Sequence, residues 1–133
     1  MRATKKLKFI VKLAVLALLL LPILTLGTSA RYSRYNIAWS GSVQATAYNS
    51  MESQTDSTPW ITASGTRCRE GVIASNFLPM GTQVLIEGFG DRVFVVEDRM
   101  NRRYNRRIDI WFRDYSDARQ FGVRTIKYHV IKA

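Results

Sequence analysis

The sequence has few of the residues that build cross-linked or metal-bound proteins. It contains one cysteine, one histidine and three prolines among 133 residues. A single cysteine excludes a disulfide framework within the chain, and a single histidine excludes a metal site with several imidazole ligands. We therefore expect neither a metal nor a cofactor.

Acidic residues are also scarce. Ten Asp and Glu stand against 20 Lys and Arg, which gives a formal net charge of +10. Such an excess is typical of proteins that bind nucleic acid or membranes. The hydrophobic share of 47% and the charged share of 23% are nevertheless ordinary, and they exclude a disordered polybasic tail. The length fits one domain with its own core.

The first thirty residues have the order of a secretory signal. Basic residues up to Lys12 precede an apolar run over residues 13–26, and small residues lead to Ala30. The run is shorter than the roughly 20 residues of a spanning helix. A retained anchor and a buried helix are the alternatives. We predict a signal over residues 1–30, with export to the periplasm or cell envelope, with or without outer-membrane attachment, or to the medium.

Removal of this segment changes the meaning of the charge. Five of the basic residues and none of the acidic ones lie before residue 31, so the net charge of +10 falls to +5. An exported protein rarely meets nucleic acid. We therefore expect no nucleic-acid partner, an anionic envelope polymer as the binding partner, and membrane contact only through an uncleaved signal.

The rest of the chain predicts one small all-β domain over residues 43–133, after an aperiodic lead-in over residues 31–42. Alternating apolar and polar residues predict strands. The predicted strands cover residues 43–48, 71–75, 82–87, 92–98, 107–112 and 125–131, and one short helix covers residues 116–121. The strand over 92–98 is apolar on both faces, so we expect it to be covered on both. A polar segment before Pro59 predicts a long loop. Short, regularly spaced strands favour a six-stranded barrel.

Two aspartates are the main catalytic candidates. Asp98 ends one predicted strand and Asp109 lies near the start of the next. If these strands are neighbours, the carboxylates converge at one end of the barrel. Paired carboxylates cleave glycosidic bonds, and each raises the pKa of the other. The alternative is two surface residues paired with local arginines.

Other polar residues suggest a binding surface. Five arginines lie between the two aspartates, the last of them Arg107, and they predict either contact with an anionic polymer or a solvated loop. The hydroxyls and glycine that would line a sugar groove are Thr46, Tyr48, Thr62, Ser64 and Gly65. The segment from Thr62 to Gly65 is equally well explained as a turn.

A nucleophilic mechanism is the minor alternative. Ser64 or Cys68 would need a base within hydrogen-bond reach, and the chain offers only His129. Arg67 and Arg69 flank Cys68 and are expected to lower the pKa of its thiol. A lone cysteine is more often inert, so a thiol enzyme is the least favoured hypothesis.

Taken together, the segments resemble the three-aspartate ("3D") domain. The matching motifs are ATAY (45–48), TASG (62–65), GVIA (71–74), LPMGT (78–82), VED (96–98), RIDIW (107–111) and ARQFG (118–122). They cover nearly the whole chain after the signal and follow one another in the order of the family. Any one of them alone would be weak.

The resemblance implies a double-psi β-barrel similar to the catalytic barrel of membrane-bound lytic transglycosylase A and to RlpA-like barrels. It implies a metal-free cleavage of the glycan strand of peptidoglycan, with Asp109 as general acid and Asp98 as the preceding aspartate. Asn76 stands where the family has its first aspartate, and Arg99 replaces a glycine. We include Asn76 and Arg107 among the expected substrate-binding residues.

Two hypotheses follow from the sequence. The first is an exported, monomeric glycosidase or lytic transglycosylase that acts on peptidoglycan in cell-wall turnover. The second is a non-catalytic module that binds peptidoglycan, which the missing first aspartate and the basic loop favour.

Overall fold

The computed structural model describes residues 31–51 and 59–133. The predicted signal (1–30) and residues 52–58 of the predicted polar loop lie outside the described residues. Residues 31–35 belong to the first of two compact units and contain a turn in which the Tyr35 N–H donates to the Tyr32 carbonyl at 3.0 Å. The second unit begins at Asn36. No helix within the described ranges is long and apolar enough to cross a membrane.

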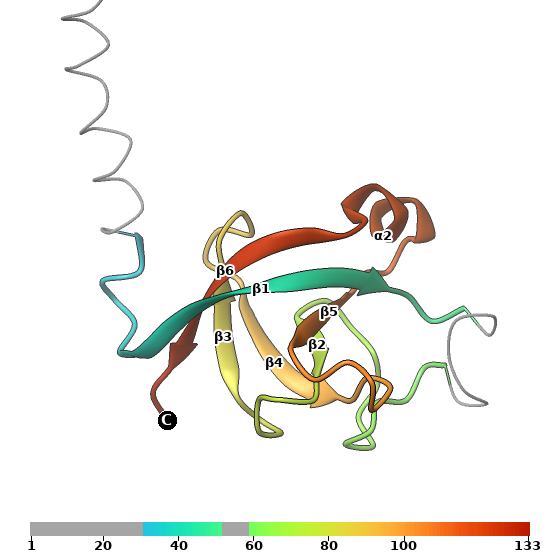
Figure 1. Cartoon of the computed structure of the whole chain (residues 1–133), viewed down its shortest axis with the longest axis horizontal. Coiled ribbons are helices and arrows are strands. Elements are labelled where there is room, and N and C mark those ends of the chain that lie inside the picture. Colours follow the sequence, from blue (N-terminus) through green and yellow to red (C-terminus); the bar gives the residue numbers. More distant parts are fainter. Residues whose placement is uncertain (1–30, 52–58) are drawn as a thin grey trace, which may run out of the picture. The chain divides into compact units, whose positions relative to one another are not determined.

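The second unit is a closed β-barrel (Figure 1). Its described residues form β1 (Ile37–Tyr48), β2 (Val72–Ser75), β3 (Gln83–Ile86), β4 (Val93–Asp98), β5 (Arg107–Trp111), α2 (Tyr115–Phe121) and β6 (Arg124–Ile131). The strands follow one another around the barrel in the order β1-β5-β2-β4-β3-β6. The predicted fold class, a six-stranded all-β barrel with one short helix, is confirmed for the described residues.

The strand pairing repeats within the barrel. β1 pairs with β5 and β2 with β4 in parallel, whereas β1–β6, β2–β5, β3–β4 and β3–β6 are antiparallel. Exchanging β1, β2 and β3 with β4, β5 and β6 leaves this pattern unchanged. The two halves of the barrel therefore have the same connectivity, and each of the two parallel pairs joins a strand of one half to a strand of the other, as in a double-psi barrel.

The core occupies the inside of the barrel, because alternate residues of each strand point inward. It is built from Val43, Ala45, Ile73, Val84, Ile86, Phe94, Val96, Ile108, Ile110, Ile126, Tyr128 and Val130, with Leu78 and Phe121. β4 differs from the prediction of cover on both faces. Phe94 and Val96 are buried, but Val93 and Val95 remain half-buried, because a barrel wall has only one inner face.

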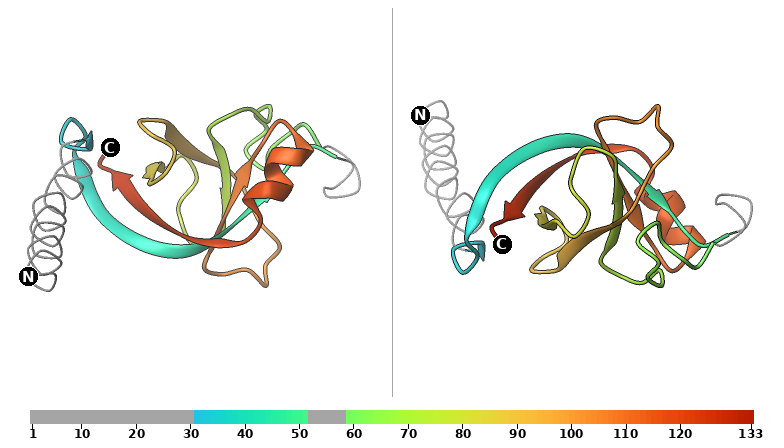
Figure 2. Two further views of the ribbon diagram at one scale, coloured as in Figure 1. Left: turned by 90° about the horizontal axis from the view of Figure 1, so that it is seen from above. Right: turned by 90° about the horizontal axis from the view of Figure 1, so that it is seen from below.

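β1 begins at Ile37 rather than at the predicted residue 43. Its first half is paired with β6, from Ile37 opposite Ile131 onward, so backbone pairing extends the strand through a segment with little apolar alternation. Gly41 permits this pairing, since a Cβ there would lie 2.9 Å from the Tyr128 hydroxyl. Figure 2 shows β1 and β6 curving together along one side of the barrel.

Helix α2 begins one residue before the predicted range of 116–121 and ends where predicted. Asp114 precedes it and Gly122 ends it at φ 61°, a conformation that favours glycine. The ring of Phe121 packs on Phe89 and Phe112, with ring centroids 6.1 and 5.5 Å away. Helix α2 is thereby joined to the β3–β4 turn.

Candidate functional site

The two candidate aspartates flank one residue of the strand between them. In the barrel order β2 separates β4 from β5, so the two aspartates do not lie on neighbouring strands. Ala74 of β2 is nevertheless the register partner of both Asp98 and Asp109. Directly opposite residues project to the same face, and two strand spacings put their Cα atoms about 10 Å apart. Ala74 itself is buried, with 3% of its surface exposed, whereas Asp98 and Asp109 on either side of it are half-buried.

Asp109 is a half-buried acid. Its neighbour on the other side is Thr46 of β1, whose hydroxyl donates to Asp109 Oδ1 at 2.8 Å. Burial raises the pKa of Asp109 to about 6, and the negative charge of Asp98 adds to this effect. The Thr46 hydrogen bond and the charge of Arg107 act in the opposite direction. The structure therefore holds a carboxyl group that binds its proton close to neutral pH.

Asp98 is held by three donors. The Tyr48 hydroxyl donates to Oδ2 at 2.9 Å, and the backbone N–H groups of Ala63 and Arg99 each donate to Oδ1 at 2.9 Å. Burial, and then the charge of Asp98, raises the pKa of Tyr48 well above its ordinary value. Tyr48 thus remains protonated and keeps its donor role.

An apolar cluster outside the barrel supplies the dry surroundings. Cys68, Val72 and Trp111 are buried together, and Tyr48 packs against them. The Trp111 indole donates to the Ser50 hydroxyl at 3.0 Å, which satisfies its polar atom. This cluster lies at the Tyr48 end of β1, where Tyr48 packs against it, and burial is the largest cause of the raised pKa of Tyr48.

The predicted hydroxyl turn lies beside Asp98. Residues 62–66 form a tight turn in which Gly65 has a φ of 81°, and the Ser64 N–H donates to the Glu97 carbonyl at 3.0 Å. Thr62 is buried, and its hydroxyl lies 2.9 Å from that of Ser64 and 2.8 Å from that of Thr66. The Thr62 hydroxyl is therefore used in hydrogen bonds within the turn, whereas the side chain of Ser64 and the backbone of Gly65 are exposed.

The charge that anchors this turn was not a predicted site feature. The Glu97 carboxylate accepts from the Thr66 hydroxyl and forms two hydrogen bonds, of 2.8 and 2.6 Å, with the Arg69 guanidinium. Arg69 lowers the pKa of Glu97. No sequence signal links residues 28 positions apart, so this pair is visible only in the fold.

Asn76 contacts the arginine-rich segment rather than the carboxyl groups. Its amide nitrogen donates to the carbonyls of Met100, Asn101 and Tyr104 at 3.0, 3.0 and 3.1 Å. Its Oδ1 accepts from the Met100 N–H at 3.0 Å. We call residues 99–107 the arginine loop. Asn76 holds this loop, so its predicted role in substrate binding stays a prediction while a structural role is evident.

The arginines of this loop have different environments. The Arg99 guanidinium donates to the carbonyls of Ser75 and Leu78, the latter at 2.9 Å. The guanidinium carbons of Arg103 and Arg107 lie 4.9 and 4.8 Å from the centre of the Tyr104 ring. Arg102, Arg103 and Arg106 are exposed and form no ion pair with an acid of the described chain.

The nucleophile candidates are not supported. Burial raises the pKa of the Cys68 thiol, and the lowering effect of Arg69 is smaller than that of burial. The side chain is buried and its Sγ donates to the Pro59 carbonyl at 3.7 Å. His129 contacts Ser40 and Glu87 instead of Ser64 or Cys68. Ser40 pairs with His129 eight residues before Tyr48, toward the far end of β1.

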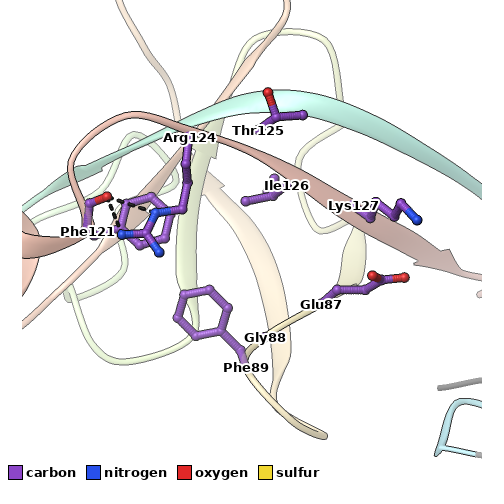
Figure 3. Close-up of a pocket in the computed structure, with 8 residues that line it drawn as sticks. All are labelled: Glu87, Gly88, Phe89, Phe121, Arg124, Thr125, Ile126 and Lys127. Carbon is purple, nitrogen blue, oxygen red and sulfur yellow. Dashed lines mark hydrogen bonds between the residues drawn. The ribbon is translucent and has the colours of Figure 1, made fainter. Parts of the chain in front are cut away.

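A hollow of about 320 Å³ lies elsewhere on the barrel, between the β3–β4 turn and the start of β6 (Figure 3). It is lined by Glu87, Gly88, Phe89, Phe121, Arg124, Thr125, Ile126 and Lys127. None of these residues was predicted as a site residue. The Arg124 guanidinium binds the C-terminal end of α2, where it donates to the Phe121 carbonyl at 2.6 Å.

Comparison with known proteins names no relative. The sequence matches no protein-family model and no curated protein. In the described segments, no three His, Cys, Asp or Glu side chains are grouped in a way that would hold a metal ion. The chemistry of the site therefore depends on Asp98, Asp109 and the residues that contact them.

Proposed function

We propose that this protein is an exported enzyme that cleaves the glycan strand of peptidoglycan, with Asp109 as general acid. The observation that carries the proposal is the environment of Asp109. Its pKa of about 6 keeps the carboxyl group protonated at mildly acidic pH, and the carboxylate of Asp98 faces it across Ala74. A protonated acid beside a carboxylate is the arrangement that glycosidic cleavage uses.

The hydrogen bonds assign a role to each oxygen. Thr46 donates to Asp109 Oδ1, so the acid carries its proton on Oδ2. That proton passes to the glycosidic oxygen as the bond between this oxygen and the anomeric carbon breaks. Asp98, held by Tyr48, stabilises the positive charge that develops on the sugar ring. Either water or a hydroxyl of the same sugar then bonds to the anomeric carbon and returns its proton to the Asp109 carboxylate.

Substrate contacts surround this pair. The exposed Ser64 and Gly65 belong to the turn that is bonded to Asp98 through Ala63. Their polar groups suit the hydroxyl groups of a glycan. On the same face of β5 as Asp109, Arg107 offers a cation to the carboxylates of the peptide stems. The resemblance to the three-aspartate domain supports the same assignment.

Purified peptidoglycan sacculi test the proposal. Wild type should release soluble muropeptides, and Asp109→Asn should release none above the no-enzyme level, because an amide cannot donate the required proton. Mass analysis separates hydrolysis from internal ring closure, since the two products differ by one water. Asp114→Asn changes an exposed aspartate outside the site and serves as the control. Equal release by wild type and Asp109→Asn would contradict the proposal.

The second candidate is a non-catalytic module that binds peptidoglycan. The observation that favours it is the basic surface of Arg102, Arg103 and Arg106, which are exposed on a loop that Asn76 holds in place. In a sedimentation assay with sacculi, Asp109→Asn should then bind as wild type does. Replacing these three arginines by glutamine should reduce binding, whereas replacing the exposed Arg113, Arg119 and Lys132 removes the same charge elsewhere. Equal loss in both triple variants would contradict a specific surface.

A further inference from the structure

Three side chains form a hydrogen-bonded row that runs from the first half of β1 across β6 to the end of β3. Ser40 of β1 lies directly opposite His129 of β6, with Ser40 Oγ 2.7 Å from His129 Nδ1. His129 Nε2 lies 3.2 Å from Oε1 of Glu87, the residue that follows β3. A hydroxyl, an imidazole and a carboxylate in this order form the arrangement that activates serine in hydrolases.

The carboxylate fixes the protonation of the ring. An ionised Glu87 can only accept a hydrogen bond, so the neutral imidazole carries its proton on Nε2. Nδ1 then has a free electron pair toward the Ser40 hydroxyl. The two ring nitrogens are exchanged relative to the usual serine hydrolase, but the requirement is the same: the base must lie within hydrogen-bond reach of the proton it removes.

The surroundings leave Ser40 accessible. Ser40 is exposed, while the His129 side chain retains 17% of its accessible surface. Lys127 lies two residues from His129 on the same face of β6, opposite Ser42 of β1. The hollow of about 320 Å³ begins at Glu87 and Lys127, and the rings of Phe89 and Phe121 form its apolar side (Figure 3).

We propose that Ser40, His129 and Glu87 form a second site that hydrolyses small carboxylic esters, independent of Asp109. Ser40 Oγ bonds to the ester carbonyl carbon while its proton passes to His129 Nδ1. The bond from this carbon to the alcohol oxygen breaks, and the alcohol leaves with that proton. Water then attacks the acylated Ser40, returns a proton through Nδ1 and releases the carboxylic acid.

The test uses p-nitrophenyl acetate as substrate and a fluorophosphonate as covalent probe. Wild type should hydrolyse the ester above the uncatalysed rate, and the probe should add to the peptide that contains Ser40. Ser40→Ala should abolish the labelling and the hydrolysis. His129→Gln should slow hydrolysis by about 100-fold or more, since general base catalysis contributes roughly 10² to 10⁴. Glu87→Gln should also reduce the rate, because a carboxylate no longer fixes the tautomer of His129. The reduction should be smaller than for His129→Gln, because the imidazole base is still present.

Ser42→Ala is the matched control, because Ser42 is another exposed serine on the same face of β1. It should hydrolyse and label as wild type does. The proposal is overturned if wild type shows no rate above background, if Ser40→Ala retains the wild-type rate, or if the probe adds elsewhere. Circular dichroism of every variant identifies a loss of fold. If His129→Gln is folded and hydrolyses the ester at the wild-type rate, His129 is not the general base.

Discussion

The protonation of Asp109 has a consequence for stability that can be measured without any substrate. Its pKa is about 6 in the folded chain, against an ordinary value of 3.8, because burial disfavours the charged form. Between about pH 4 and pH 6 the folded chain therefore keeps a proton that the unfolded chain releases. This contribution to stability is complete below pH 4 and is lost as the pH rises through 6.

The magnitude follows from the size of the shift. Two pKa units correspond to about 3 kcal/mol at most, and partial solvent exposure of Asp109 reduces this, so we expect roughly 1 to 3 kcal/mol. Asp109→Asn removes the ionisation and keeps an oxygen that accepts from Thr46. The variant should be more stable than wild type by this amount at pH 7.5, and the difference should vanish near pH 4.

Urea unfolding of both proteins at several pH values between 4 and 7.5 measures the difference. Other titrating groups, including Glu97 with its lowered pKa, are common to both proteins and cancel in the comparison. Asp114→Asn replaces an exposed acid outside the site with an uncharged residue of the same shape that is also a good N-cap residue, and it serves as the control. If the difference in unfolding free energy between wild type and Asp109→Asn does not change with pH, the raised pKa of Asp109 is refuted.

Three further predictions concern the same face of the barrel. Release of muropeptides by wild type should fall about tenfold for each pH unit above 6, because only the protonated Asp109 can act as the acid, and a turbidity assay of sacculi measures this. Thr46→Val should raise the pKa of Asp109 further and move that pH profile upward, since it removes a donor to the carboxylate; a profile that moves downward would contradict this. Asn76→Asp should destabilise the chain by about 2 to 4 kcal/mol in urea unfolding, because a carboxylate lacks the two amide N–H groups that serve three backbone carbonyls, whereas the exposed Asn105→Asp should change stability little.

The strands of this barrel were predictable because their signal is local. Alternation of apolar residues placed every strand to within a few residues except the start of β1, where pairing with β6 extends the strand without such a pattern. Their order around the barrel was not predictable from alternation. It depends on contacts between residues far apart in the chain, so the insertion of β2 between β4 and β5 is a property of the closed barrel.

Side-chain chemistry shows the same limit. Arg67 and Arg69 adjoin Cys68 in sequence and predicted a lowered thiol pKa, but burial among Val72 and Trp111 has the larger effect. The contacts of Asp109, by contrast, come from residues that the sequence had already selected, since Thr46 was a predicted binding residue. Residue type selected Thr46 and Asp109 as candidates, and the fold brings them into contact and raises the pKa of Asp109.

Asn76 joins the arginine loop to the carboxylate site. It holds the loop through its bonds to Met100, Asn101 and Tyr104, and the first residue of that loop, Arg99, donates its N–H to Asp98. A carboxylate at position 76 has no N–H group to offer these carbonyls. Asparagine at position 76 therefore holds the basic loop beside the two aspartates. Because Asn76 is not an acid, Asp98 and Asp109 are the two carboxyl groups that the proposed glycan chemistry can use. For this reason Asn76 should affect the reaction through the position of Asp98.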